Sequence, residues 1–223
     1  MKARRIPLGL LMLSRGQITS QHLQQALDAQ RCVPGLRVGE MLRQMKLARE
    51  IDVTMALAAQ WSCPVMRNLP SHPTQCALPV EILRRFAMVP AYYSRATGKL
   101  HLAFADNIDY RVVVATERML NCKAEVCLTT RTAFDCALEQ IEERKLSNEK
   151  MFTNLPQAED AIGIVVNYVQ QLRAHEVRAV NCSELFWAKI LGGASGVDLL
   201  FSRAGFPDAY GGLSQFEQQA LLA

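Results

Sequence analysis

An internal repeat in the first sixty residues limits what this chain can fold into more than any other feature. Compared with itself at an offset of 30 residues, the sequence aligns segment 7–30 with segment 37–60. The identical pairs are Gly9 and Gly39, Ala26 and Ala56, Leu27 and Leu57, Ala29 and Ala59, and Gln30 and Gln60. Repeats of this size are supersecondary units that bury their apolar faces against each other. The repeat therefore predicts one helical subdomain with two similar halves.

Each copy has the spacing of a short helix, a turn and a longer helix. Leu23 and Leu27, for example, lie four residues apart on one helical face. Thr19 or Ser20 is suited to cap the first longer helix, because a hydroxyl oxygen accepts a free backbone N–H there. Arg49 stands in place of Thr19 in the second copy. We therefore expect the second longer helix to start without such a cap.

Two interpretations of the repeated glycines and glutamines stay open. Gly9 and Gly39 either let two helices pack closely or let backbone N–H groups approach a ligand. Gln30 and Gln60 either cap the helix ends or present donors and acceptors to a ligand.

The tandem copies resemble the MshEN-like N-terminal domain of type II secretion and type IV pilus assembly ATPases. The motif of this family is R-L-G-x-x-L-x-x-x-G-x6-L-x-x-x-L-x-x-Q, and in some members the tandem motifs bind cyclic di-GMP. The resemblance implies a candidate cyclic di-GMP site at the matching positions. These are Leu8, Gly9, Gly16, Leu23, Leu27 and Gln30 in the first copy, and Arg37, Val38, Gly39, Leu42, Leu57 and Gln60 in the second.

The chain departs from the family motif at two positions. Pro7 replaces the leading arginine of the first copy, and Lys46 replaces the second glycine of the second copy. In ligand-binding members this arginine is implied to hold guanine and phosphate, which a planar cation does well and proline cannot do. Arg37 supplies the cation in the second copy, and Arg4 or Arg5 is close enough in sequence to replace Pro7.

The resemblance extends to about residue 146 and implies a small α/β subdomain over 69–146. The expected elements are a short helix from Leu78, strands from Met88 and Lys99 joined by a turn at 97–98, a helix over 109–120, a strand over 124–129 and a helix over 132–143. Asp106 and Asp109 lie in the loop before the helix at 109. They are equally suited to cap that helix and to contact a ligand.

The remainder predicts a third unit. The polar segment 147–160 has the composition of a linker, and 161–223 predicts a C-terminal domain with a helix over 161–172 and strands over 177–180, 185–190 and 197–201. With the tandem helical repeat over 1–68, the expected fold class is α+β.

No enzyme activity is expected. The chain has no G-x-x-x-x-G-K-[ST] motif for ATP hydrolysis, and the glycine-rich segment 192–196 is typical of a β-turn. The seven cysteines form no C-x-x-C pair. They are expected to be reduced, buried thiols, rather than a zinc site built from Cys122, Cys127, His72 and Cys76. No metal or cofactor is expected.

The formal net charge of +4 is spread along the chain, so the composition does not require a nucleic-acid partner. No apolar run reaches the length of a membrane span, so we expect no membrane insertion and a cytoplasmic location.

Two functions stay open. The first is a non-catalytic regulatory or adaptor protein of a type II secretion or type IV pilus system that binds cyclic di-GMP. The second is a docking module without nucleotide binding, which contacts a secretion or pilus assembly component. The resemblance implies that this partner is the cytoplasmic part of an inner-membrane protein or a cognate ATPase.

Overall fold

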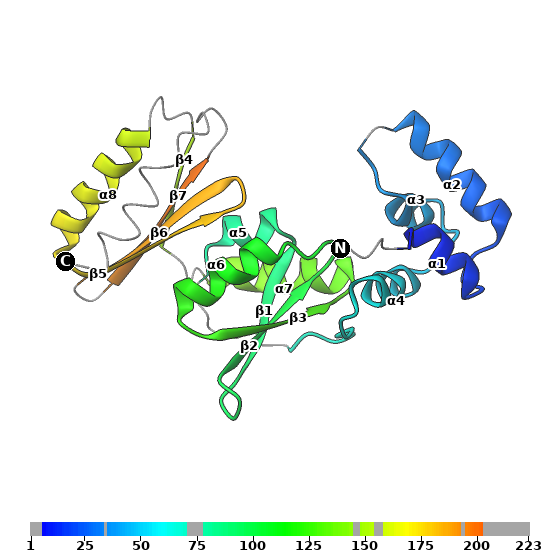
Figure 1. Cartoon of the computed structure of the whole chain (residues 1–223), viewed down its shortest axis with the longest axis horizontal. Coiled ribbons are helices and arrows are strands. Elements are labelled where there is room, and N and C mark those ends of the chain that lie inside the picture. The colour runs from blue at the N-terminus through cyan, green and yellow to red at the C-terminus, as the bar shows by residue number, and fades with distance from the viewer. Residues whose placement is uncertain are drawn as a thin grey trace.

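The computed structural model of the chain describes residues 6–33, 35–70, 78–144, 148–153, 158–192 and 195–202. Three units lie in a row, with the N-terminal helices at one end and the C-terminal sheet with its helix at the other (Figure 1). The described residues form helices and two small sheets, so the predicted α+β class is confirmed.

The internal repeat folds into four helices. They are α1 (Leu8–Ser14) and α2 (Ser20–Cys32) in the first copy, and α3 (Val38–Gln44) and α4 (Glu50–Trp61) in the second. α1 packs mainly against α4, and α2 packs mainly against α3. Each copy therefore buries its apolar face chiefly against the other, around a core that includes the fully buried side chains of Met12, Ala26, Leu42 and Ala56.

The two longer helices start as the sequence predicts. The Thr19 hydroxyl oxygen accepts the backbone N–H of His22 at 3.1 Å. Arg49 precedes α4 without a side-chain cap and instead pairs with Asp52, with Nε 2.7 Å from Oδ2.

The middle unit is a three-stranded sheet with three helices. Its elements are α5 (Val80–Arg85), β1 (Met88–Ser94), β2 (Lys99–Phe104), α6 (Tyr110–Leu120), β3 (Lys123–Leu128) and α7 (Arg131–Arg144). The strand order is β1-β2-β3, with β1 antiparallel and β3 parallel to β2. Leu100, Leu102 and Phe104 are fully buried, as their alternation predicts, and Ala103 between them is fully buried as well.

The C-terminal unit is a four-stranded sheet with one helix. Its elements are β4 (Glu149–Phe152), α8 (Ala158–Leu172), β5 (Ala174–Cys182), β6 (Leu185–Gly192) and β7 (Ser195–Ser202), in strand order β4-β7-β6-β5. Gly192 pairs with Ser195 where the turn was predicted, while residues 193 and 194 and the segment 203–223 lie outside the described residues.

The predicted linker over 147–160 needs a correction, because it contains β4 and the start of α8. β4 pairs in parallel with β7, and the Phe152 ring stacks on Phe201 with centroids 5.1 Å apart. The Glu149 carboxylate also accepts the backbone N–H of Val80 at 2.6 Å. Tertiary contacts therefore order a short segment whose composition is that of a loop.

The two faces of the C-terminal sheet have different neighbours. Phe186 and Ile190 belong to a core shared with α8, whereas Leu185 and Trp187 belong to the core of the middle unit. The alternation of a strand sends neighbouring side chains to opposite faces, which explains this division. The C-terminal sheet and the middle unit therefore share one hydrophobic core.

The helical repeat joins the middle unit at the end of α4. Leu128 donates its N–H to the carbonyl of Pro64 at 2.9 Å, and Met66 donates to the carbonyl of Leu128 at 2.7 Å. The rings of Trp61 and Tyr110 lie beside this pairing, with centroids 6.2 Å apart.

Candidate functional site

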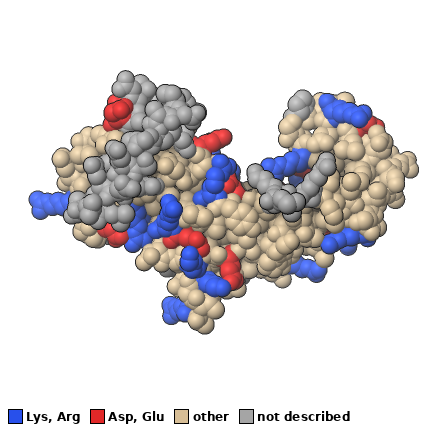
Figure 2. Space-filling model, viewed as in Figure 1, with Lys and Arg blue, Asp and Glu red and all other residues tan. Residues whose placement is uncertain are grey.

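A cleft of about 590 Å³ lies between the helical repeat and the middle unit. One wall comes from the start of α1, from α3 and the residues before it, and from α4. The other comes from the end of α5, the loop after β2 and the start of α7. The space-filling view shows the hollow between these two parts of the molecule (Figure 2). Its size is within the range of small-molecule sites.

Arg37 and Arg43 bring two guanidinium groups to the helical wall. Arg37 directly precedes α3 with an extended backbone, and both residues are exposed. Within the described residues, neither guanidinium forms an ion pair. These two groups are therefore available to an anionic ligand, which arginine can bind with two parallel hydrogen bonds.

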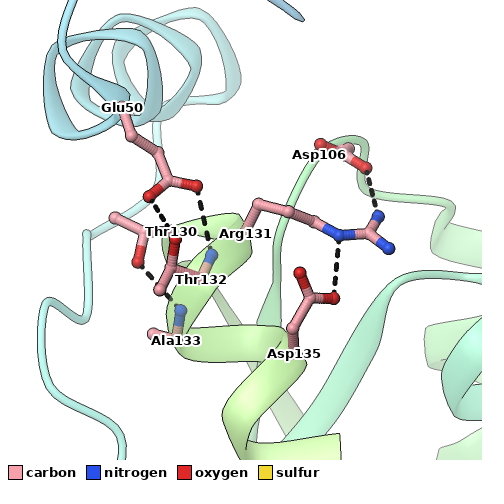
Figure 3. Close-up of polar contacts among 7 residues, drawn as sticks. All are labelled: Glu50, Asp106, Thr130, Arg131, Thr132, Ala133 and Asp135. Atoms are coloured by element: carbon pink, nitrogen blue, oxygen red, sulfur yellow. Dashed lines mark hydrogen bonds and ion pairs between the residues drawn. The ribbon is translucent and has the colours of Figure 1, made fainter. Parts of the chain in front are cut away.

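Arg131 lies on the opposite wall and is held by two carboxylates (Figure 3). Its Nη1 lies 3.4 Å from Oδ2 of Asp106, and its Nε lies 3.0 Å from Oδ1 of Asp135. Asp106, for which capping and ligand contact were both open, thus has Arg131 as its partner.

Asp109 acts as the cap of α6. Its Oδ1 accepts the backbone N–H of Arg111 at 2.9 Å, and its Oδ2 lies 2.7 Å from Nη2 of the same residue. The hydrogen bond from the Arg111 guanidinium lowers the pKa of the Asp109 carboxyl.

Glu50, in the first turn of α4, reaches across the cleft to the start of α7 (Figure 3). Its Oε1 accepts the backbone N–H of Thr132 at 3.1 Å, and its Oε2 accepts the Thr132 hydroxyl at 2.8 Å. The hydroxyl of Thr130 accepts the N–H of Ala133 at 3.2 Å. The start of α7 is therefore capped by one local side chain and one side chain from the helical repeat.

The cleft combines both signs of charge. Four arginines line it, Arg37, Arg43, Arg85 and Arg131, together with five carboxylates, Glu40, Glu50, Asp106, Asp109 and Asp135. Asp106 and Asp135 pair with Arg131, and Arg85 pairs with Glu184 at 2.6 Å. The arginines of the described cleft without an ion pair are thus Arg37, directly before α3, and Arg43, within α3.

Four of the site residues implied by the tandem motifs lie in this cleft, namely Leu8, Arg37, Gly39 and Leu57. The structure assigns packing contacts to the two repeated glycines. A Cβ atom on Gly9 would lie 2.5 Å from Leu23 Cδ1, and one on Gly39 would lie 2.8 Å from Leu8 Cδ2. Close helix packing, one of the two interpretations left open, is therefore observed at both glycines.

The side chain of each repeated glutamine bonds to the backbone just before the other copy. Gln30 at the end of the first copy donates to the carbonyl of Leu36, just before the second copy, at 2.6 Å. Gln60 at the end of the second copy donates to the carbonyl of Ile6, just before the first, at 2.5 Å. The pairs Gln30–Leu36 and Gln60–Ile6 are equivalent in the repeat, so the copies are related by an approximate two-fold arrangement.

The remaining implied residues do not line the cleft. Leu42 is fully buried, Leu23 and Val38 pack partly buried against the same core, and Leu27 lies exposed on α2. Gly16 lies in the turn after α1 with a positive φ of 66°. Arg4 and Arg5, the expected substitutes for Pro7, lie outside the described residues.

Sequence reasoning missed the cleft residues of the middle unit, above all Arg131 and Asp135, and also missed Arg43 and Glu50. The family motif does not include them, and their proximity depends on the packing of two units. The sequence signal nearest to these residues was the hydroxyl-rich start of α7 at Thr129, Thr130 and Thr132, which is typical of a capped helix N-terminus.

Cys127 and Cys182 are buried as expected and Cys63 and Cys122 are half-buried, whereas Cys32 and Cys136 are exposed, so the expectation of buried thiols is wrong for these two. Burial affects the pKa of the covered thiols. It raises the pKa of Cys127 and of Cys182 to about 12, and it also raises the pKa of Cys63 and of Cys122. His72 and Cys76, which completed the alternative zinc site, lie outside the described residues. Where side chains are described, no group of three or more metal-binding residues is placed around a common point.

Within the described residues, no helix is long and apolar enough to cross a bilayer.

Comparison with known proteins gives similarity at the level of structure. No family model and no curated protein matches the chain. Several solved structures are similar, including those of MshE and of the N-terminal domain of XpsE. MshE with cyclic di-GMP has 26% identity and a TM-score of 0.47, over 61% of this chain and 99% of that one. The N-terminal domain of XpsE has 20% identity and a TM-score of 0.50, over 63% of this chain and 98% of that one.

Proposed function

We propose, from the fold that this chain shares with the N-terminal domain of XpsE, that it is a non-catalytic regulatory or adaptor protein of a type II secretion or type IV pilus system. The shared fold confirms the resemblance that the tandem motifs indicated, and the function is inferred from it. We further propose that the chain binds cyclic di-GMP in the cleft between the helical repeat and the middle unit.

The observation that carries this proposal is the position of Arg37. This residue matches the leading arginine of the second motif, lines the cleft and has no ion pair within the described residues. Leu8 and Leu57, from the first and second motifs, lie in the same cleft. A guanidinium group beside apolar side chains suits a ligand with phosphates and flat bases, because arginine binds phosphate and stacks on aromatic rings.

The test is a calorimetric titration of the purified chain with cyclic di-GMP, with GTP and cyclic di-AMP as ligand controls. We expect selective binding, and we expect Arg37→Ala to weaken it by about tenfold or more, since a hydrogen bond to a charged group contributes roughly 1.5–3 kcal/mol. Arg31→Ala is the matched control, because Arg31 is exposed on α2 and pairs with Asp28 outside the cleft. Equal affinity for Arg37→Ala and Arg31→Ala would exclude the cleft as the site.

A docking module is the second candidate, and two observations favour it. The cleft contains more carboxylates than arginines, and Pro7 provides no cation where the first motif has arginine. The partner would be the cytoplasmic part of an inner-membrane assembly protein or a cognate ATPase. Binding of such a partner by a chain that gives no heat with cyclic di-GMP would favour this function over the first.

A further inference from the structure

The helix α4 is held differently at its two ends. Its C-terminal end is fixed by backbone pairing, because Pro64 and Met66 bond with Leu128 of β3 at 2.9 and 2.7 Å. The rings of Trp61 and Tyr110 add a second contact at this end. At the N-terminal end, the side-chain hydrogen bonds found between the described residues of α4 and α7 are the two from Thr132 to Glu50. One end of α4 is therefore attached through the backbone and the other through one side chain.

The face of α4 that starts at Glu50 forms a wall of the cleft. Glu50, Val53, Thr54 and Leu57 all line the cleft and recur at the spacing of one helical face. α4 has 12 residues, which corresponds to a rod of about 18 Å. Movement of its N-terminal end about the fixed C-terminal end would therefore change the width of the cleft.

Glu50 is a carboxylate of the cleft that bonds across it to neutral groups. Asp106 and Asp135 pair with Arg131, and all three belong to the middle unit. Glu50 comes from the other unit, and among the described residues its side-chain partners are the neutral N–H and O–H groups of Thr132. An anion bound in the cleft repels every carboxylate there. Among the described residues, neither Glu40 nor Glu50 forms an ion pair, and of these two only Glu50 bonds to the middle unit.

We propose that Glu50 is a latch, which an anionic ligand in the cleft displaces from Thr132. Release lets α4 pivot about its C-terminal end, so that the helical repeat changes its orientation relative to the middle unit. The latch thereby converts ligand binding into a change of shape that a partner can sense. The identity of the ligand, cyclic di-GMP, rests on the proposed function, whereas the contact between Glu50 and Thr132 does not.

Amide hydrogen exchange at Thr132, followed by NMR, tests the latch in the full chain. Glu50→Ala is expected to speed this exchange by about fivefold or more, the effect of losing a hydrogen bond worth roughly 1 kcal/mol. Glu40→Ala is the matched control, since it removes the same charge from the same cleft while leaving the contact with Thr132 in place. It should leave the exchange at Thr132 unchanged.

Cyclic di-GMP is the probe that tests whether ligand binding releases Glu50 from Thr132. Added to the wild-type chain, it should speed exchange at Thr132 as Glu50→Ala does. It should also bind Glu50→Ala about fivefold more tightly than it binds wild type, because no latch has to be broken. A larger radius of gyration on binding, measured by small-angle X-ray scattering, would support the pivot.

The outcomes separate the latch from the proposed function. Binding to the wild-type chain with unchanged or slower exchange at Thr132 overturns the latch and leaves cyclic di-GMP binding intact. Equal exchange in Glu50→Ala and wild type also overturns the latch, whether or not the probe binds. If the probe binds neither protein, the displacement by ligand fails together with the proposed function, even where Glu50→Ala speeds the exchange.

Discussion

Lys46 adopts a backbone conformation that suits glycine better than lysine. Its φ is +56°, and Gly16, at the equivalent position of the first copy, has a φ of +66°. Both residues follow the short helix of their copy and reverse the chain toward the longer one. The glycine of the family motif at this position is thus explained by turn geometry, and Lys46 keeps the same turn at the cost of strain.

Replacing Lys46 by glycine should therefore stabilise the chain. We expect Lys46→Gly to raise the free energy of unfolding by roughly 0.5–1 kcal/mol, measured by urea denaturation, because the left-handed strain is removed. Gly16→Lys is the reciprocal variant and should lower the free energy of unfolding by a similar amount. If both variants were destabilising, contacts of the Lys46 side chain would outweigh the strain.

At the scale of helices and strands, apolar periodicity was a sufficient guide for most elements. The four helices of the repeat and the strands β1, β2 and β3 lie within a few residues of their expected positions. β4 was missed because Glu149–Phe152 is only four residues long and lies in a polar segment. Its order comes from pairing with β7 and from contact with α5, which no local pattern reveals.

Alanine substitutions at two glycines of the C-terminal unit are expected to change stability in opposite directions. The space around the Cβ position is filled at one glycine and empty at the other. A Cβ atom on Gly192 of β6 would lie 2.4 Å from the carbonyl oxygen of Leu172, at the end of α8, whereas one on Gly163 of α8 would meet nothing within 4 Å. Gly192→Ala should lower the free energy of unfolding by about 2 kcal/mol, since backbone must move. Gly163→Ala should raise it by about 1 kcal/mol, since alanine favours helix.

The stabilities of Gly192→Ala and Gly163→Ala can be measured by thermal and urea unfolding, with circular dichroism as the signal. A mild effect of Gly192→Ala would show that β6 and the end of α8 move apart easily. Such a result would contradict the close packing of the C-terminal unit.

At the scale of the whole molecule, the shared core joins the last two units. Trp187 of β6 and Leu200 of β7 are fully buried in the same core as Leu102 of β2. Asp198 accepts hydrogen bonds from Trp187 Nε1 at 2.7 Å and from Lys189 Nζ at 2.8 Å on this face of the sheet. These hydrogen bonds satisfy the polar groups of three buried side chains within the C-terminal sheet. The hydrophobic core that both units share favours their unfolding together.

Trp187→Ala should therefore destabilise the middle unit as well as its own sheet. We expect a loss of about 3–5 kcal/mol, typical of a large buried side chain, and a matching loss of amide protection in β2 and β6. Hydrogen exchange with mass spectrometry measures both strands at once. Val166→Ala, at an exposed position on α8, is the control. Protection retained in β2 but lost in β6 would mean that the two units unfold separately.

The sequence motif predicted residues of one wall of the candidate site, the wall of the helical repeat. It predicted no residue of the α7 wall. The motif that contains Arg37 and Gly39 lies within one short segment, so a linear pattern reveals it. Arg131 and Asp135 face that motif because the fold places the start of α7 across the cleft from α3 and α4. Contacts between distant segments of this kind depend on the packing of whole units, which local spacing does not encode.

The crossed glutamine contacts have a consequence for recognition. Gln30 and Gln60 each hold the chain just before the other copy, as equivalent residues do across the axis of a symmetric dimer. Cyclic di-GMP has a two-fold axis of its own, so its halves would meet equivalent groups on such a pair. Here the equivalent positions carry Arg37 and Pro7, so the two copies differ where the family motif has arginine. The two identical halves of a symmetric ligand would thus contact different side chains, one half meeting Arg37 and the other meeting Pro7.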